Sequence, residues 1–197
     1  SDTNSIYTDF YTLPTKVTGV DCDYFNTSVK QGKATFSWDK NPVATGYQYE
    51  IYKYNGKKKL LTGTVDKYSY DYASVSNSKL KPRQIYKIRV RAFVNTANNT
   101  KKYGAWSSYD YFSRCADTDL SLKKSSGKIK ASWSKVTGAT SYYVYMSTKY
   151  NGGYKKVTTT TKTSLVINKT IKSGKYYYVR IVPNYKSGKT TYSATVN

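Results

Sequence analysis

The stretch SWDKNPVATGYQYE (residues 37–50) returns 95 residues later as SWSKVTGATSYYVY (residues 132–145). In both copies a tryptophan, Trp38 or Trp133, precedes a tyrosine by nine residues. The distance between the copies exceeds the roughly 20–50 residues of a solenoid repeat. The repeat therefore predicts two tandem domains of one design.

Short runs rich in tyrosine and β-branched residues fill the chain, and helical periodicity is nearly absent. Gly, Asn, Ser and Lys turn clusters separate these runs at a spacing of roughly 8–12 residues, which is typical of a β-sandwich or barrel. We expect strands at 15–22, 33–38, 46–54, 58–65, 68–75, 85–94 and 105–112, and again at 118–124, 128–133, 141–147, 154–160, 164–168, 176–182 and 190–196. The expected organisation is an N-terminal extension (1–13), a first domain (14–113), a linker (114–118) and a second domain (119–197).

Tyrosine dominates the apolar content of this 197-residue chain, which has a hydrophobic share of 38% and 24 tyrosines. Tyrosine buries its ring while its hydroxyl stays in water, so it suits thin sandwiches. No run approaches the roughly 20 apolar residues of a membrane span. Ser1 opens no signal-peptide pattern, so we interpret the chain as a mature protein or an excised fragment. We expect a monomer without membrane insertion.

The charge is strongly positive, with 33 Lys and Arg against 11 Asp and Glu and a net charge of +22. The segment 114–197 contributes +14 of this and the segment 1–113 contributes +8. Such a field attracts polyanions: nucleic acid, anionic lipid, teichoic acid, or sulfated and sialylated glycans. The alternative is that the lysines only keep an exposed β-surface soluble. Specific nucleic-acid binding is not expected, because no helix is available for a groove and the lysines follow no single path.

Catalysis is not expected. The chain has no histidine, which excludes Ser-His-Asp triads and most zinc sites, and Glu50 is its only glutamate. Aspartates pair only at Asp21 with Asp23 and at Asp117 with Asp119, where turn or edge charges explain them. We predict a protein that is not an enzyme and has no catalytic residues, cofactor or metal site.

The run LKPRQIYKIRVRA (residues 80–92) resembles the E–F turn and F strand of fibronectin type III domains. In that family a leucine precedes a tyrosine by six residues with a proline between them, as Leu80, Pro82 and Tyr86 do here. Ile171 and Tyr177 have the same spacing in the second unit. The resemblance implies that each tyrosine hydroxyl bonds to the backbone that precedes it and forms a tyrosine corner.

Trp38 and Trp133 match the strand B tryptophan of the same family, which packs between two sheets. The resemblance covers nearly everything from Pro14 onward, and the second unit looks most like versions from surface and secreted proteins of Gram-positive bacteria. It implies an all-β fold of two tandem immunoglobulin-like (fibronectin type III) seven-stranded β-sandwiches. It also implies an extracellular or cell-surface location.

The strand period of two sorts the side chains by face. In the second domain it places five candidate ligand-binding residues outward: Tyr143, Tyr145, Tyr176, Tyr178 and Arg180. Rings and amines together could stack on sugars and meet their sulfate or carboxylate groups. The alternative is that the tyrosines only stabilise the sheet as cross-strand pairs.

In the first domain the outward positions are Gln48, Glu50, Tyr52, Lys87, Arg89 and Arg91. Arg89 and Arg91, with Trp106 and Tyr109, resemble the arginine and tryptophan ladder of cytokine receptor domains. In such a ladder guanidinium planes stack between rings, which favours a structural role over a ligand site.

Cys22 and Cys115 lie at predicted strand ends that meet at one pole of the first domain. A disulfide between them would contribute about 4–5 kcal/mol in the chain-entropy model. The alternative is two unpaired thiols.

We therefore expect a non-catalytic binding, adhesion or spacer module of a larger cell-surface protein, in contact with an anionic glycan or cell-wall polymer, or with a protein. One alternative is an accessory spacer of a secreted polysaccharide-degrading enzyme. Another is a receptor-like, protein-binding pair.

Overall fold

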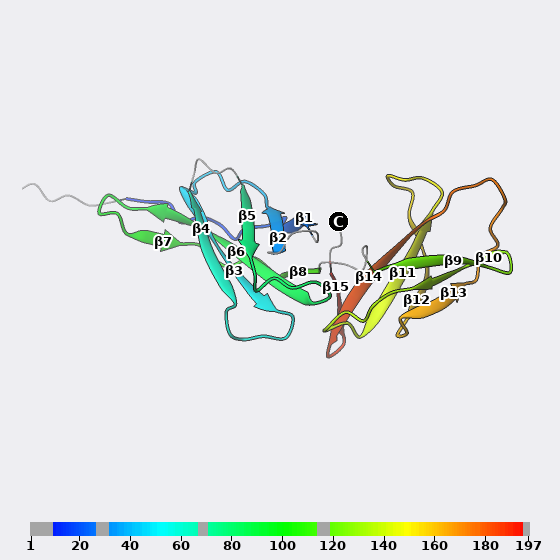
Figure 1. Cartoon of the computed structure of the whole chain (residues 1–197). Helices are drawn as coiled ribbons and strands as arrows, with labels where there is room; N and C mark the ends of the chain where they lie inside the picture. The colour runs from blue at the N-terminus through cyan, green and yellow to red at the C-terminus, as the bar shows by residue number, and fades with distance from the viewer. Residues whose placement is uncertain (1–9, 27–31, 67–70, 114–118, 195–197) are drawn as a thin grey trace, which may run out of the picture.

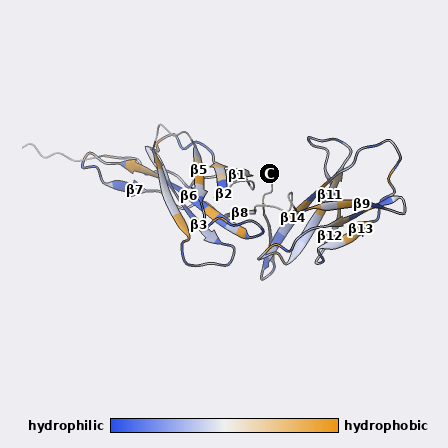
Figure 2. Cartoon of the chain, in the orientation of Figure 1, coloured by the Kyte–Doolittle hydropathy of each residue, from blue (hydrophilic) through white to orange (hydrophobic). Residues whose placement is uncertain are grey.

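A computed structural model describes residues 10–26, 32–66, 71–113 and 119–194, which form two β-sandwiches in tandem (Figure 1). This part of the chain contains strands, turns and irregular segments, and no helix. Hydrophobic and hydrophilic residues alternate within strands such as β6 (Figure 2), as expected for strands that bury one face.

The first sandwich stacks two antiparallel sheets. One sheet has the order β1-β2-β5, and the other has the order β4-β3-β6-β7 with β8 also paired to β6. The strands are β1 (Asp21–Asn26), β2 (Gly32–Ser37), β3 (Gly46–Lys53), β4 (Leu61–Asp66), β5 (Tyr72–Asn77), β6 (Ile85–Asn95), β7 (Lys101–Tyr103) and β8 (Asp110–Ser113).

The second sandwich repeats this plan with the orders β13-β10-β9 and β12-β11-β14-β15. Its strands are β9 (Ser121–Ser125), β10 (Lys128–Ser132), β11 (Ser141–Ser147), β12 (Lys155–Thr160), β13 (Ser164–Ile167), β14 (Tyr178–Ser187) and β15 (Thr190–Ser193). The fold is all-β, with two immunoglobulin-like sandwiches of the fibronectin type III kind, as the sequence predicted. Among the described residues the second sandwich has the expected seven strands, whereas the first has eight, because the short strand β7 pairs with the end of β6.

Three strand predictions differ from the structure. Residues 15–20 lie outside any strand, and Tyr176 precedes β14. The strand expected at 105–112 is confined to β8, because Ser107 Oγ, in place of a backbone carbonyl, accepts the Val90 N–H at 2.9 Å. That side-chain bond interrupts the ladder along β6.

The repeated tryptophan and tyrosine face each other in each core. The ring centroids of Trp38 and Tyr47 lie 5.2 Å apart, and those of Trp133 and Tyr142 lie 5.4 Å apart. Both tyrosine hydroxyls accept a backbone N–H from the loop just upstream, at 2.9 Å for Tyr47 and 3.0 Å for Tyr142. Each repeat therefore joins a core contact to the anchoring of a loop.

A second tyrosine hydroxyl holds the turn before β6 and before β14. Tyr86 donates to the Lys79 carbonyl at 3.0 Å and accepts the Lys81 N–H at 2.7 Å. Tyr177 accepts the Lys172 N–H at 3.0 Å. These contacts have the geometry of the tyrosine corner.

The two sandwiches contact each other end to end. Thr137, in the loop between β10 and β11, donates its N–H to the Arg83 carbonyl at 2.8 Å and accepts the Ile85 N–H at 3.0 Å. An ion pair of 3.0 Å joins Arg83 to Asp119. Tyr111 of the first sandwich stacks on Tyr192 of the second, with 4.5 Å between ring centroids.

Candidate binding surface

Each sandwich has an outer sheet face formed by two central strands, β3 with β6 and β11 with β14. Residues directly opposite each other on antiparallel strands share a face. Glu50 lies opposite Arg89 on the first outer face, and Tyr145 lies opposite Arg180 on the second. Both faces combine aromatic and cationic side chains, and they differ in how far these side chains are exposed to solvent.

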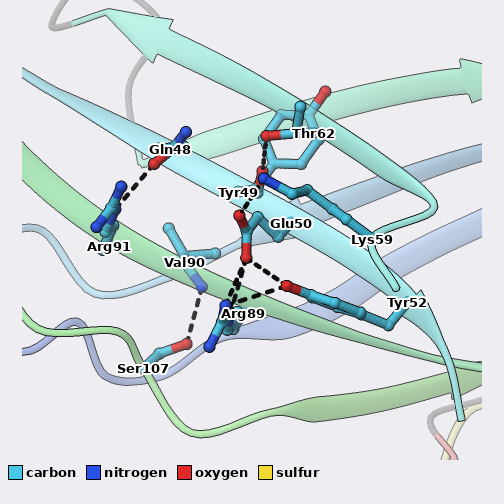
Figure 3. A network of polar contacts seen from close by, with 10 residues as sticks. All are labelled: Gln48, Tyr49, Glu50, Tyr52, Lys59, Thr62, Arg89, Val90, Arg91 and Ser107. Carbon is cyan, nitrogen blue, oxygen red and sulfur yellow. Dashed lines mark hydrogen bonds and ion pairs between the residues drawn. The ribbon is translucent and has the colours of Figure 1, made fainter. Parts of the chain in front are cut away.

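Glu50 lies at the centre of a polar network on the first face (Figure 3). Its Oε2 accepts hydrogen bonds from Arg89 at 2.7 and 3.0 Å and from the Tyr52 hydroxyl at 2.6 Å, and its Oε1 pairs with Lys59 at 2.7 Å. Burial on its own raises the pKa of this carboxyl. The hydrogen bonds from Lys59, Tyr52 and Arg89 outweigh burial and lower the pKa to about 2.

Three rings from the segment 103–109 and the three cations of β6 form a stacked ladder over this face. Arg91 lies 3.7 Å from the Tyr103 ring centroid and 4.4 Å from that of Trp106. Arg89 lies 4.3 Å from the Trp106 ring centroid, and Lys87 lies 4.5 Å from the Tyr109 ring centroid. The cations of the first face are therefore engaged within the protein, and Glu50 beneath them is buried.

The second outer face is open. Arg180 and Lys156 are exposed, and Tyr143 and Tyr145 are half-buried. Lys156 lies 4.3 Å above the Tyr143 ring, and Arg180 lies 4.4 Å above the Tyr154 ring. The cations and rings thus alternate across β12, β11 and β14 and remain accessible to solvent.

Four of the five predicted residues lie on this face, on β11 or β14: Tyr143, Tyr145, Tyr178 and Arg180. Tyr176 does not, because it precedes β14 in the turn at the end of the sandwich, where it is 81% exposed. Sequence reasoning missed Tyr154 and Lys156. Their i, i+2 spacing in the run YKKV was the available signal, since it places Lys156 of β12 and Tyr154, which immediately precedes β12, on the same side of the sheet.

The surroundings of this face carry almost no negative charge. Asp119 is the only acidic residue in the segment 119–197, and it is paired with Arg83. The positive potential of the second sandwich is therefore not neutralised by neighbouring carboxylates.

The described members of the predicted acidic pairs have partners away from this surface. Asp23 accepts a hydrogen bond from the Ser37 hydroxyl at 2.8 Å, and Asp117 is outside the described residues. Asp110 on β8 is the carboxyl whose pKa is raised, to about 7, by burial and by the nearby charge of Asp21, against a hydrogen bond from the Cys22 N–H.

The structure describes one of the two cysteines. Cys22 is buried on β1, whereas Cys115 lies outside the described residues, so the disulfide stays a prediction.

Within the described ranges, His, Cys, Asp and Glu form no group of three or more that could hold a metal ion. Those ranges also contain no helix of the length and hydropathy needed to span a membrane.

Comparison with known proteins identifies no family. No protein-family model matches the chain, and no curated protein matches it. A solved structure titled "Crystal structure of chicken CNTN1 FN1-FN3 domains" is 17% identical, with a TM-score of 0.41 over 93% of this chain and 68% of that one. Another, titled "Myokine structure", is 15% identical, with a TM-score of 0.39 over 51% of this chain and 96% of that one. Both TM-scores are below 0.5, so the fold assignment depends on the strand topology itself.

Proposed function

We propose that the chain is a non-catalytic extracellular binding module whose second sandwich attaches to an anionic glycan or cell-wall polymer. Sandwiches of this kind are typically binding or spacer modules. The observation that carries the proposal is the contrast between the two outer faces. The first face is covered by its own rings, while the second presents Arg180 and Lys156 beside half-buried tyrosines.

The chemistry of the open face fits a charged polysaccharide. A tyrosine ring offers a flat apolar surface and a hydroxyl, which suit the apolar face and the hydroxyl rim of a sugar. Arg180 and Lys156 offer charged donors for sulfate, phosphate or carboxylate groups. Because the net charge of the chain is +22, the binding constant is expected to fall steeply as salt rises.

Retention on immobilised heparin in a sodium chloride gradient tests the proposal. The variant Lys156→Gln/Arg180→Gln removes two charges from the face. Its control, Lys123→Gln/Lys130→Gln, removes two exposed charges that lie opposite each other on β9 and β10, in the other sheet. We expect the face variant to bind heparin about three- to tenfold more weakly than the control, which corresponds to about 0.7–1.4 kcal/mol.

The ring contribution is tested separately by Tyr143→Ala/Tyr145→Ala, which leaves the net charge unchanged. We expect lower affinity for heparin at a fixed salt concentration. Suppose that the face variant and its control lose the same affinity for heparin, and that the ring variant loses none. Heparin binding would then depend only on the total charge of the protein, and the proposal would be rejected.

A further inference from the structure

A cleft at one corner of the first sandwich is lined by lysines. It lies between the hairpin that joins β3 to β4 and the loop that joins β5 to β6, and its volume is about 490 Å³. Five lysines line it: Lys53, Lys57, Lys58, Lys59 and Lys79. Its other lining residues are Asn55, Gly56 and Leu60, so none of the described residues that line it carries a carboxylate. We call it the lysine cleft.

The backbone on both sides of the lysine cleft is held by hydrogen bonds. In the hairpin, Gly56 donates its N–H to the Lys53 carbonyl at 2.9 Å. In the loop, the Lys79 N–H donates to Asn77 Oδ1 at 2.9 Å, and the Lys79 carbonyl accepts the Tyr86 hydroxyl at 3.0 Å. The tyrosine corner therefore also positions Lys79 at the cleft. A site on a backbone that is already ordered loses less conformational entropy when it binds a ligand.

Most of the charge in the lysine cleft has no counter-ion within the protein. Lys59 bonds to Glu50 at 2.7 Å (Figure 3), and no ion pair between described residues includes any of the other four lysines. The segments 53–60 and 78–83, which flank the cleft, contain no Asp or Glu. Ammonium groups around one cleft repel one another, and an anion between them removes that repulsion. Four positive charges of the cleft are therefore free to bind an anion.

The corresponding corner of the second sandwich lacks this concentration of charge. Its cleft lies between the ends of β11 and β12 and the loop before β14, and its volume is about 190 Å³. The lysines that line it are Lys155 and Lys169, and they lie beside Met146 and Tyr177. Because the same corner forms with two lysines in the second sandwich, the five lysines of the first are not a requirement of the fold.

The chemistry of the lysine cleft favours some anions over others. A lysine ammonium is a compact point charge that suits phosphate and sulfate oxygens, whereas the paired donors of arginine match a planar carboxylate. No arginine is among the described residues that line the cleft. Its volume is within the range of about 300–1,000 Å³ that is usual for small-ligand sites, so it has room for several linked groups. Four unpaired charges also call for a ligand with more than one negative charge.

We infer that the lysine cleft binds an anion in which two or more phosphate or sulfate groups are linked, as in an oligophosphate or a multiply sulfated oligosaccharide. Lys53, Lys57, Lys58 and Lys79 bind the anion, while Lys59 stays bonded to Glu50. The inference does not depend on the proposed polymer binding, which involves the sheet face of the other sandwich.

NMR titration of the full chain with inorganic tripolyphosphate tests the inference. We expect saturable shifts of the amide signals of residues 54–60 and 79. The variant Lys57→Gln/Lys79→Gln removes two charges from the cleft and should bind about three- to tenfold more weakly. Its control, Lys40→Gln/Lys102→Gln, removes two exposed charges that do not line the cleft, and we expect it to lose less than about twofold.

Two further ligands test which groups the cleft recognises. Inorganic phosphate has a single group and should bind at least about tenfold more weakly than tripolyphosphate, because it engages fewer of the four charges. A heparin-derived tetrasaccharide carries linked sulfate groups on sugars. Shifts at the cleft with tripolyphosphate or with the tetrasaccharide support the inference and identify the source of the linked groups.

The sheet-face variant Lys156→Gln/Arg180→Gln separates this result from the proposed function. It should keep its affinity for tripolyphosphate even if it no longer differs from its own control on heparin. The inference is overturned if neither compound with linked groups shifts the amides of the cleft. It is also overturned if Lys57→Gln/Lys79→Gln and its control lose the same affinity, or if inorganic phosphate binds as tightly as the compounds with linked groups.

Discussion

Glu50 and Arg89 lie directly opposite each other on β3 and β6, and two hydrogen bonds of 2.7 and 3.0 Å join them beneath a layer of aromatic rings. The Glu50 side chain is only 6% exposed, and the Tyr52 hydroxyl and the Lys59 amine also bond to it. The Glu50 carboxylate therefore stabilises the first face. Its removal would leave Arg89 and Tyr52 partly buried without the acceptor of their hydrogen bonds.

We expect Glu50→Ala to lower the free energy of unfolding of the first sandwich by about 3 kcal/mol, the usual cost of breaking a buried ion pair. Lys59→Ala removes the exposed partner of the same carboxylate and should cost less than about 1 kcal/mol. Urea denaturation followed by tryptophan fluorescence measures both. Equal losses for the two variants would contradict the assignment of Glu50 as the centre of the network.

Asp110 should make the stability depend on pH in the opposite direction from a salt-bridged carboxylate. Burial, together with Asp21, raises the pKa of Asp110 from 3.8 to about 7, and its Oδ2 has no hydrogen-bond partner among the described residues. The folded protein therefore keeps the proton that the unfolded chain has already lost near pH 4. This contribution is complete below about pH 4 and is lost as the pH rises through 7.

We expect the free energy of unfolding of the first sandwich to fall by roughly 2–4 kcal/mol between pH 4 and pH 7 on account of this group. Asp110→Asn keeps the shape but does not titrate, so it should flatten that part of the profile. Urea denaturation at half-unit pH intervals measures the difference between the two proteins. Glu50 makes a contribution of opposite sign at the lower end of this range, because its carboxyl has an ordinary pKa of 4.5 in the unfolded chain and a pKa of about 2 in the folded protein. Both proteins contain Glu50, so this contribution cancels in the difference between their profiles. Parallel profiles for the two proteins would refute the prediction.

The features that sequence reasoning could predict are those encoded by local spacing. Tyr47 follows Trp38 by nine residues and Tyr86 follows Leu80 by six, and both distances lie within one strand and one turn. The inward and outward sides of β11 follow from the strand period in the same way. These features need no knowledge of where distant segments lie.

The features that it missed depend on contacts between segments far apart in the chain. The rings of 103–109 cover the first outer face because Ser107 bonds to Val90 on a different strand. The contact of Thr137 with Ile85 depends on how one sandwich lies against the other. No periodicity within a strand predicts either contact. The ladder of Arg89, Arg91, Trp106 and Tyr109 was expected only from its resemblance to cytokine receptor domains, and that resemblance does not include the bond of Ser107 to Val90.

The two tyrosine corners should differ in strength. Tyr86 is fully buried and its hydroxyl makes two backbone hydrogen bonds, whereas Tyr177 is half-buried and accepts one from Lys172. We expect Tyr86→Phe to destabilise the first sandwich by about 2 kcal/mol and Tyr177→Phe to destabilise the second by about 1 kcal/mol. Urea denaturation of each variant gives the values. A larger loss for Tyr177→Phe would mean that burial of the hydroxyl does not set its contribution.

Gly138 offers a test of the contact between the two sandwiches. Its φ is +94°, and a Cβ atom there would lie 2.6 Å from the Tyr54 ring of the other sandwich. Gly127 is the matched control, because its φ is +72° but a Cβ atom there meets nothing within 4 Å. Gly138→Ala therefore adds a clash to the backbone strain that Gly127→Ala introduces alone.

We expect Gly138→Ala to speed hydrogen exchange at the Thr137 amide at least about tenfold and to broaden the distance distribution from small-angle X-ray scattering, as two separated sandwiches would. Gly127→Ala should cost the second sandwich about 1 kcal/mol of stability and leave both readouts unchanged. If the Thr137 amide stayed protected in Gly138→Ala, the Tyr54 ring would have to move aside at little cost in free energy. The contact between the sandwiches would then not require a glycine at position 138.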